Sequence, residues 1–357
     1  MEVVKTRRWN GGRPMQPVAM RGRAITPAEA LAEVKAKWAM ITAEDSEGED
    51  DEEEEDYYAF QASRFKDTWD FAFYGSFDET ILNLLAAKVP PMRFTDKKPE
   101  PCHSAFPRTT LQIFSLKVTE TSGGLQWPLH VFGKVAVRDS VDHKRNMIFD
   151  RTRDKCQFLT PEVPYLKLTG PTRAVVLLDP VTFDVDLKVK GTTESDDKHL
   201  SFLAVPFMSS TPLQSVPLKR NYTSKLSMLE FALGVVVYSV EASITVQVTG
   251  GSWPSGYRAQ FVAHTSSIIG PEVILLDSGD DKVPVAGDGT ITLSRSVASV
   301  EVIGKLKVSV KAWQDTNIVE HSTRRFRPKK AGRSVGTLDL SFCNMGVTVA
   351  WSLVSSN

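Results

Sequence analysis

Two stretches of alternating side chains constrain the fold of this chain most. At positions 129–138 small or apolar residues alternate with other side chains, and at 181–190 five apolar residues alternate with polar ones. A period of two sends successive side chains to opposite faces of a β-strand. We therefore predict antiparallel β-structure with one buried face.

Further strand patterns fill the chain as far as its C-terminus. The apolar run from Ala174 to Leu178 predicts a strand covered on both faces, and the alternation from Val236 to Val248, which includes Tyr238 in the buried set, predicts another. Other candidates are Tyr257–His264, Glu272–Asp277, Thr290–Ser294, Val297–Ile303, Lys305–Ala312 and Val347–Leu353. Many short strands with little helical pattern between them are typical of a β-sandwich or barrel.

Composition shifts divide the chain into four predicted parts. Residues 1–43 form a basic arm and an amphipathic helix, and residues 44–107 form an acidic linker and an aromatic-rich tether. Residues 108–200 and 201–355 form two β subdomains, separated at the polar connection Thr192–His199. The predicted fold class is thus mainly β, an antiparallel sandwich or barrel preceded by a helix and a disordered acidic linker.

The first 43 residues combine a basic arm with a helix signal. The arm, residues 1–25, holds six Lys or Arg and is expected to be disordered, with RNA contact or nuclear targeting as the alternatives. Thr26, Pro27 and Glu29 fit an N-cap, a first helical position and a capping box. Apolar residues then recur at helical spacing up to Ile41. This stripe would dock on a partner helix or fold back onto the β body.

An acidic run and an aromatic segment follow. Residues 44–56 carry eleven carboxylates and no opposing charge, so we expect an extended linker, or alternatively a segment that masks a basic surface. A short helix is predicted near Asp78, and a breaker-rich tether follows it. Packing of the aromatic residues on the β body is the expected arrangement, and a docking segment for another protein is the alternative. These aromatic residues are Phe65, Trp69, Phe71, Phe73, Tyr74 and Phe77.

Charge and cysteine usage bound the compartment and the partners. The chain has 43 basic and 43 acidic residues, so no overall field draws it to nucleic acid or anionic lipid. Its three cysteines are too scattered for a disulfide framework, and no signal peptide or membrane span stands out. We expect a cytoplasmic or nuclear protein that is not secreted and does not enter a membrane.

The residues offer little sign of metal or catalytic chemistry. The six histidines lie far apart, so we predict no metal and no cofactor. The segment Gly250–Pro254 resembles a nucleophile elbow but ends in proline, and turn chemistry explains it. Asp184 and Asp186 are expected on the solvated face of a strand rather than in a calcium site. An enzyme of unrecognised type would draw on Asp139, His143 and Arg173.

One basic block stands out within the β region. Guanidinium groups mixed with a ring are typical of nucleic-acid surfaces, although a charged edge strand or loop has the same composition. This candidate binding site consists of Arg324, Arg325, Phe326, Arg327, Lys329, Lys330 and Arg333.

Several motifs resemble a family of uncharacterised domains abundant in cereal grasses. They cover about residues 108–353, and the preceding helix and acidic stretch also look like what such proteins carry. The motifs are Gly124–Leu129, Val135–Ser140, Leu168–Val176, Asp179–Val181, Val185–Gly191, Val240–Ala242 and Val349–Ser352.

The resemblance implies a domain without a known activity. Some proteins of this family carry a ribosome-inactivating rRNA N-glycosidase domain beside it, which implies a link to stress or defence. That enzyme's Glu-Ala-x-Arg signature begins at Glu241 but has Ile244 where arginine is needed. Depurination by this chain is therefore not expected.

Three hypotheses for the function stay open at this stage. The first is a non-catalytic protein-interaction module of a plant stress or defence protein. The second is a ribosome- or RNA-associated protein that uses the basic block. The third is an enzyme of unrecognised type.

Overall fold

The computed structural model describes residues 54–75, 77–79, 94–96, 105–141, 144–209, 213–279 and 281–354. Within these ranges the chain is mainly β and has one α-helix, α2 (Glu54–Ala72). No helix in these ranges has the length and apolar character needed to cross a membrane. The predicted basic arm and the helix predicted over 27–41 lie outside the described residues, as does nearly all of the short helix predicted near Asp78.

The first lobe is a sandwich of two antiparallel sheets. Its outer sheet has the order β3-β2-β6-β7, with β4 paired to β2, and it faces β1, β5, β8 and the start of β9 (Ser227–Gly251). The elements of this lobe that precede β9 are β1 (Arg108–Thr121), β2 (Leu129–Arg138), β3 (Asn146–Arg151), η3 (Arg153–Lys155), β4 (Gln157–Leu159), β5 (Val175–Val176), β6 (Val181–Val189), η4 (Glu194–Asp196), β7 (Lys198–Phe207) and β8 (Val216–Ser224).

The second lobe is a sandwich as well. A four-stranded sheet of order β11-β10-β14-β15 faces the strands β16, β17, β13 and β12, which join the second half of β9. The elements that follow β9 are β10 (Arg258–Thr265), β11 (Val273–Asp277), β12 (Thr290–Ile291), β13 (Val297–Glu301), β14 (Leu306–Gln314), β15 (Asn317–Phe326), β16 (Ala331–Asp339) and β17 (Cys343–Ser352).

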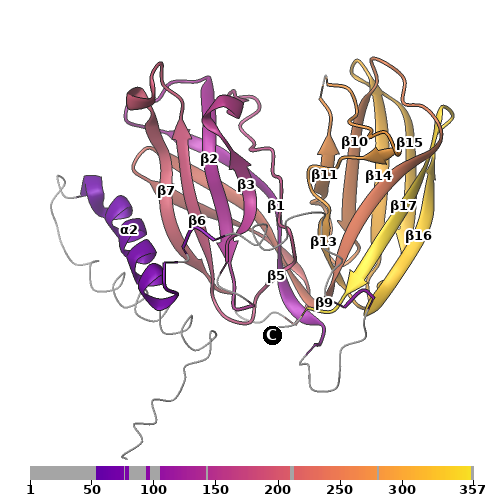
Figure 1. Cartoon of the computed structure of the whole chain (residues 1–357), viewed down its shortest axis with the longest axis horizontal. Coiled ribbons are helices and arrows are strands. Elements are labelled where there is room, and N and C mark those ends of the chain that lie inside the picture. Colours follow the sequence, from indigo (N-terminus) through magenta and orange to yellow (C-terminus); the bar gives the residue numbers. More distant parts are fainter. Residues whose placement is uncertain are drawn as a thin grey trace, which may run out of the picture.

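Strand β9 belongs to both lobes. Its first half pairs with β1 and β8, and its second half pairs with β12, β13 and β17. Figure 1 shows β9 running from one lobe into the other, with α2 on the outer side of the first lobe. The described sheets are open and packed face to face, which confirms the mainly β, antiparallel class and selects the sandwich of the two predicted architectures.

Two hydrophobic cores divide the chain within β9. Along β9 the first core ends at Val235 and the second begins at Val236, and the second core also contains Phe94, Ala105 and Phe114. The polar segment Thr192–His199 instead predicts an internal boundary near residue 200. The polar connection there is real, but β7 follows it and returns to pair with β6 along its whole length. Residues 198–235 therefore lie with the first core.

Strand β9 bends where the lobes meet. Tyr238 has a positive φ of 46°, and its side chain is 54% exposed. The alternation from Val236 to Val248 had assigned Tyr238 to the buried face. That assignment is wrong because the left-handed backbone at this residue interrupts the period of two.

Helix α2 packs on the outer sheet of the first lobe. Phe65 and Trp69 are fully buried, and with Phe77 they form a small core against Ala204 of β7. The predicted packing of the aromatic segment on the β body is thus confirmed for these rings, whereas Phe71 and Tyr74 are exposed. The helix begins at Glu54, inside the run that was predicted to be an extended linker up to Asp56.

The docked helix segment covers a buried charge cluster. Asp184 of β6 accepts hydrogen bonds from Arg138 Nη2 (3.0 Å) and Arg145 Nε (2.8 Å) through the same oxygen. The Arg138 guanidinium lies 4.6 Å from the centroid of the Trp69 ring and 4.3 Å from that of Phe77. The prediction that Asp184 lies on a solvated face is therefore wrong, because α2 and Phe77 cover that part of the sheet.

Candidate binding face of the second lobe

The basic block predicted at residues 324–333 does not form one surface. The ring of Phe326 is buried in the second core and is not available for stacking on a ligand. The stem of Arg324 lies over Gly336, where an added Cβ would come within 2.7 Å of Arg324 Cγ. Arg325, Arg327, Lys329 and Lys330 are exposed.

The remaining member of the block, Arg333, is held by a carboxylate. It forms an ion pair with Asp96, and the hydrogen bonds that Arg333 donates to this carboxylate raise the pKa of Arg333. The backbone oxygen of Arg333 also accepts a hydrogen bond from Lys329 Nζ (2.7 Å). Arg333 and Lys329 therefore contribute to the structure of the β15–β16 hairpin.

Strand register gathers a different set of cations on the outer face of β10, β14 and β15. Lys307 lies opposite Arg325 and opposite His264, and Lys311 lies opposite His321. Directly opposed residues share one face of an antiparallel sheet. The alternate residues of β14, Val308 and Val310, point into the core. We call the outward-facing set Arg258, His264, Lys307, Lys311, His321 and Arg325, together with Trp313 opposite Arg258, the basic face.

Three cations of the basic face have no acidic partner. Among the described residues, Lys307, Lys311 and Arg325 form no ion pair, whereas Arg258 is bound by Asp277 through two hydrogen bonds of 2.9 and 2.7 Å. Burial alone would raise the pKa of Asp277, but the hydrogen bonds from Arg258, Gly279 and Gln260 lower it overall. The face therefore carries a net positive charge.

Short side chains form the face between two rows of basic residues. One row consists of Arg325, Lys307 and His264, and the other of His321 and Lys311. Ser309 and Thr323 lie opposite each other, and their hydroxyl oxygens are 3.0 Å apart. Val262 completes this row on β10. Residues two apart on a strand are separated by about 7 Å. The result is a shallow polar floor flanked by long basic side chains.

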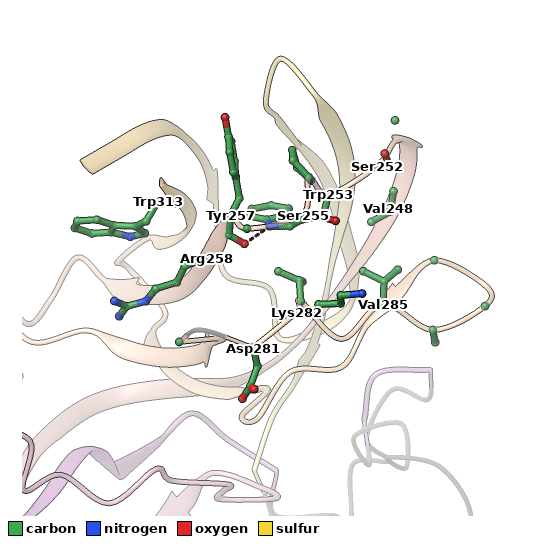
Figure 2. Close-up of a pocket in the computed structure, with 18 of the residues that line it drawn as sticks. Val248, Ser252, Trp253, Ser255, Tyr257, Arg258, Asp281, Lys282, Val285 and Trp313 are labelled. Carbon is green, nitrogen blue, oxygen red and sulfur yellow. Dashed lines mark hydrogen bonds between the residues drawn. The ribbon is translucent and has the colours of Figure 1, made fainter. Parts of the chain in front are cut away.

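A cavity of about 630 Å³ opens at one end of the basic face. The turn after β9, the connection between β11 and β12 and the turn after β14 enclose it. Figure 2 shows Arg258 and Trp313 together on one side of the cavity and Lys282 near Val285 on another. The Arg258 guanidinium carbon lies 5.9 Å from the centroid of the Trp313 ring. Both residues therefore belong to the basic face and to the cavity wall.

The loop residues considered for catalysis form a structural cluster between the lobes. Both terminal nitrogens of Arg173 bond to the carboxylate of Asp139, at 2.6 and 2.7 Å. That carboxylate also accepts the N–H groups of Val141 and Val176. His143 lies outside the described residues. Asp139 and Arg173 therefore satisfy each other and the backbone, which is an arrangement that stabilises the fold.

The structure also places the residues that were considered for metal binding and for nucleophilic catalysis. No cluster of three or more His, Cys, Asp or Glu side chains suited to a metal occurs within the described residues. The segment Gly250–Pro254 forms the end of β9 and the following turn, and part of it lines the cavity.

Sequence reasoning missed most of the basic face. Its weak signal was the alternation of Lys305, Lys307 and Lys311 with apolar residues in one strand. Nothing in the linear sequence placed Arg325 and His264 beside that strand.

Comparison with known families identifies the domain. Residues 110–349 match DUF6598, a domain of unknown function. The chain belongs to the DUF6598 family. The DUF6598 domain runs from β1 to β17, which confirms an uncharacterised domain over nearly the span expected from the sequence motifs. Helix α2 precedes it. No curated protein matches the chain.

Solved structures show only remote likeness to the DUF6598 chain. The tandem C2 domains, A and B, of extended-synaptotagmin 2 align with 75% of this chain and 100% of theirs, at 7% identity and a TM-score of 0.22. Human GIVD cytosolic phospholipase A2 in complex with methyl γ-linolenyl fluorophosphonate aligns over 69% of this chain and 32% of its own, at 8% identity and a TM-score of 0.23. Such low scores carry no argument about fold or function.

Proposed function

We propose that this chain is a non-catalytic binding module whose second lobe binds single-stranded RNA on the basic face. The observation that carries the proposal is the alignment of Lys307, Lys311 and Arg325 on one outward sheet face, where none of them pairs with an acidic side chain of the described residues. Phosphate groups attract such cations and release condensed counterions on binding. Asp277, an acidic side chain beside the face, is bound to Arg258.

The neighbouring aromatic residue supports RNA as the ligand. Proteins that bind single strands combine a basic track with rings on which bases stack. Trp313 lies opposite Arg258 on the same sheet and adjoins Lys311 along the strand. The Ser309 and Thr323 hydroxyl oxygens lie 3.0 Å apart and bond to each other. The face thus offers charge and stacking, which are the requirements of binding.

Charge removal on the basic face tests the proposal. The triple variant Lys307→Gln, Lys311→Gln, Arg325→Gln should bind a labelled RNA of about ten nucleotides more weakly, because three phosphate contacts are lost. Each contact contributes about 0.7 to the slope of log affinity against log salt, so the slope should become shallower by about 2. Fluorescence anisotropy over a salt series measures both quantities.

A matched variant distinguishes RNA binding by the basic face from RNA binding by the β15–β16 connection. Arg327→Gln, Lys329→Gln, Lys330→Gln removes the same charge from the β15–β16 connection, and its salt slope should stay close to that of the unmodified protein. Equal losses in both triple variants would mean that the attraction is not located on the sheet face. Absence of RNA binding by the unmodified chain would reject the proposed function itself.

A second function, protein interaction, is favoured by exposed apolar side chains where the lobes meet. Leu213, Tyr238 and Ile303 are large and more than half exposed. Hydrogen bonds hold their segments together: Ser215 Oγ contacts Glu301 Oε2 (3.0 Å) and the Val237 N–H (3.1 Å), and Val302 N–H donates to Tyr238 O (3.0 Å). Contiguous exposed apolar area marks interaction surfaces. This proposal includes the plant stress or defence setting that the family resemblance implies.

Polar substitution of the apolar patch tests the second function. Leu213→Ser combined with Ile303→Ser should abolish capture of a salt-resistant protein from nuclease-treated plant extract, because apolar contacts are little affected by salt. The control Val335→Ser removes a side chain that is similarly exposed on β16 and should leave the capture unchanged. If the double variant retains the captured protein, the patch is not its binding site.

A further inference from the structure

We infer that the cavity at the end of the basic face accepts one unpaired nucleobase of the bound strand. This inference rests on the proposed RNA binding and adds a second, separate contact to it. The cavity shares Arg258 and Trp313 with the basic face, so a strand that follows the face reaches the cavity without a gap. Its volume of about 630 Å³ lies within the range of small-molecule sites.

The wall formed by the turn after β9 is fixed before any ligand arrives. Trp253 Nε1 donates to the backbone oxygen of Tyr257 at 2.8 Å, and Figure 2 shows this bond beside the cavity. The Phe342 ring meets the Trp253 and Tyr257 rings edge-on, with centroid distances of 5.3 and 5.5 Å. A preformed wall reduces the entropy lost when a ligand binds.

The opposite wall offers a ring for stacking. Trp313 lies between the basic face and the cavity, and Asp277 holds the Arg258 guanidinium beside its ring. Unlike the indole N–H of Trp253, that of Trp313 is buried and has no acceptor within the described residues.

The polar groups of the cavity suit the edge of a base better than a phosphate. Asp281 and Asp315 line the cavity together with Lys282. Carboxylates repel a phosphate group but accept hydrogen bonds from the ring and exocyclic N–H groups of bases, whereas an ammonium donates to base oxygen and nitrogen. The cavity therefore differs chemically from the basic face, whose unpaired groups are cations.

Open space around two glycines makes room for the base. Gly256 and Gly279 both have positive φ, and a Cβ built on either meets no atom within 4 Å. Both line the cavity. Their backbones shape the loops while they add no side chain to the space between Trp313 and the turn after β9.

The test compares two RNAs of equal length and charge, one of normal composition and one made of abasic nucleotides. Trp313→Leu should lower the affinity for normal RNA by about 5- to 150-fold, the range given by stacking of one base on a ring. Its affinity for abasic RNA and its salt slope should not change, because the phosphate contacts remain.

Two further variants keep the result interpretable. Ser255→Trp places a bulky ring at the cavity wall without touching Trp313, and it should weaken normal RNA and spare abasic RNA in the same way. Phe158→Leu changes an exposed ring of the first lobe and should alter neither affinity. Thermal unfolding of each variant separates a lost contact from a lost fold.

The possible outcomes distinguish the inference from the function on which it rests. Equal weakening of normal and abasic RNA by Trp313→Leu, or no effect of Ser255→Trp, overturns the nucleobase site while RNA binding stands. Failure of the unmodified protein to bind either RNA overturns both. Binding of an acidic peptide with the same salt slope and the same affinity as RNA would also overturn the nucleobase site.

Discussion

Replacing Asp184 with alanine is expected to lower the free energy of unfolding by about 3–5 kcal/mol, the usual effect of leaving buried charges without their partner. Arg138 is fully buried, and Arg145 is nearly so. Burial lowers the pKa of Arg138 to about 10, and the charge of Asp184 opposes that shift. Without Asp184 the two guanidinium groups lose the carboxylate that bridges them, although Arg145 Nη1 still donates to Asp78 Oδ1 (2.7 Å). Urea unfolding followed by circular dichroism measures the loss.

The neighbouring Asp186 provides the matched control. It lies two residues further along β6, its side chain is 44% exposed, and its partner His199 is 3.7 Å away. Asp186→Ala should therefore change stability by less than about 1 kcal/mol, as is usual for surface ion pairs. Similar losses of stability in the two variants would show that α2 does not shield the Asp184 cluster from water.

The stability of the protein should fall by about 3 kcal/mol between about pH 4.5 and pH 7 because of Glu241 alone. Burial raises the pKa of this carboxyl from 4.5 to about 7, and the Ala174 N–H, which donates to it at 2.5 Å, only partly opposes that shift. The unfolded chain loses this proton near pH 4.5, and the folded chain retains it up to about pH 7. The contribution is therefore complete below pH 4.5 and is lost as the pH rises.

Glu241→Gln isolates this effect because glutamine does not ionise and can still accept the Ala174 hydrogen bond. The variant should have a flatter dependence of stability on pH than the unmodified protein, and the two curves should separate by about 3 kcal/mol between about pH 5 and about pH 8. Chemical unfolding at these two pH values measures the difference. Parallel curves would falsify the assignment of the titration to Glu241.

The strands were predictable because burial on one face leaves a local pattern. Phe183, Val185 and Leu187 alternate in the sequence and are fully buried in the first core. Asp184 lies between them, and the same alternation assigned it to solvent. The element that covers it, α2, is more than a hundred residues away in the sequence, so no local pattern reports the contact.

The helix itself left a signal that was interpreted differently. Ala62, Phe65 and Trp69 have helical spacing and are all buried, but their aromatic neighbours Phe71 and Tyr74 obscured the stripe. The acidic run before them also favoured an extended chain. The packing of Ala62, Phe65 and Trp69 against β7 stabilises the helix. This stabilisation outweighs the tendency of the acidic run to stay extended where the helix begins.

The basic face could not be predicted because it depends on register. A slip of one residue between β14 and β15 would turn Arg325 inward and Arg324 outward. The tight connection from Gln314 to Asn317 and the bulge between Ala312 and Trp313 together set Lys307 opposite Arg325. A linear reading instead grouped Arg324 to Arg333 as one block, although that block bends around a hairpin.

The passage of β9 through both lobes has a consequence for the DUF6598 unit as a whole. The chain moves from one sandwich to the other inside a hydrogen-bonded strand, and the Arg295 guanidinium reinforces the junction by donating to the backbone oxygens of Ile113 (2.5 Å) and Phe114 (3.2 Å). A cut at this crossing would divide the strand where Ser239 lies opposite both Arg108 and Glu301. Truncation within β9 would therefore disturb both sandwiches, and it is a poor way to assign a function to either one.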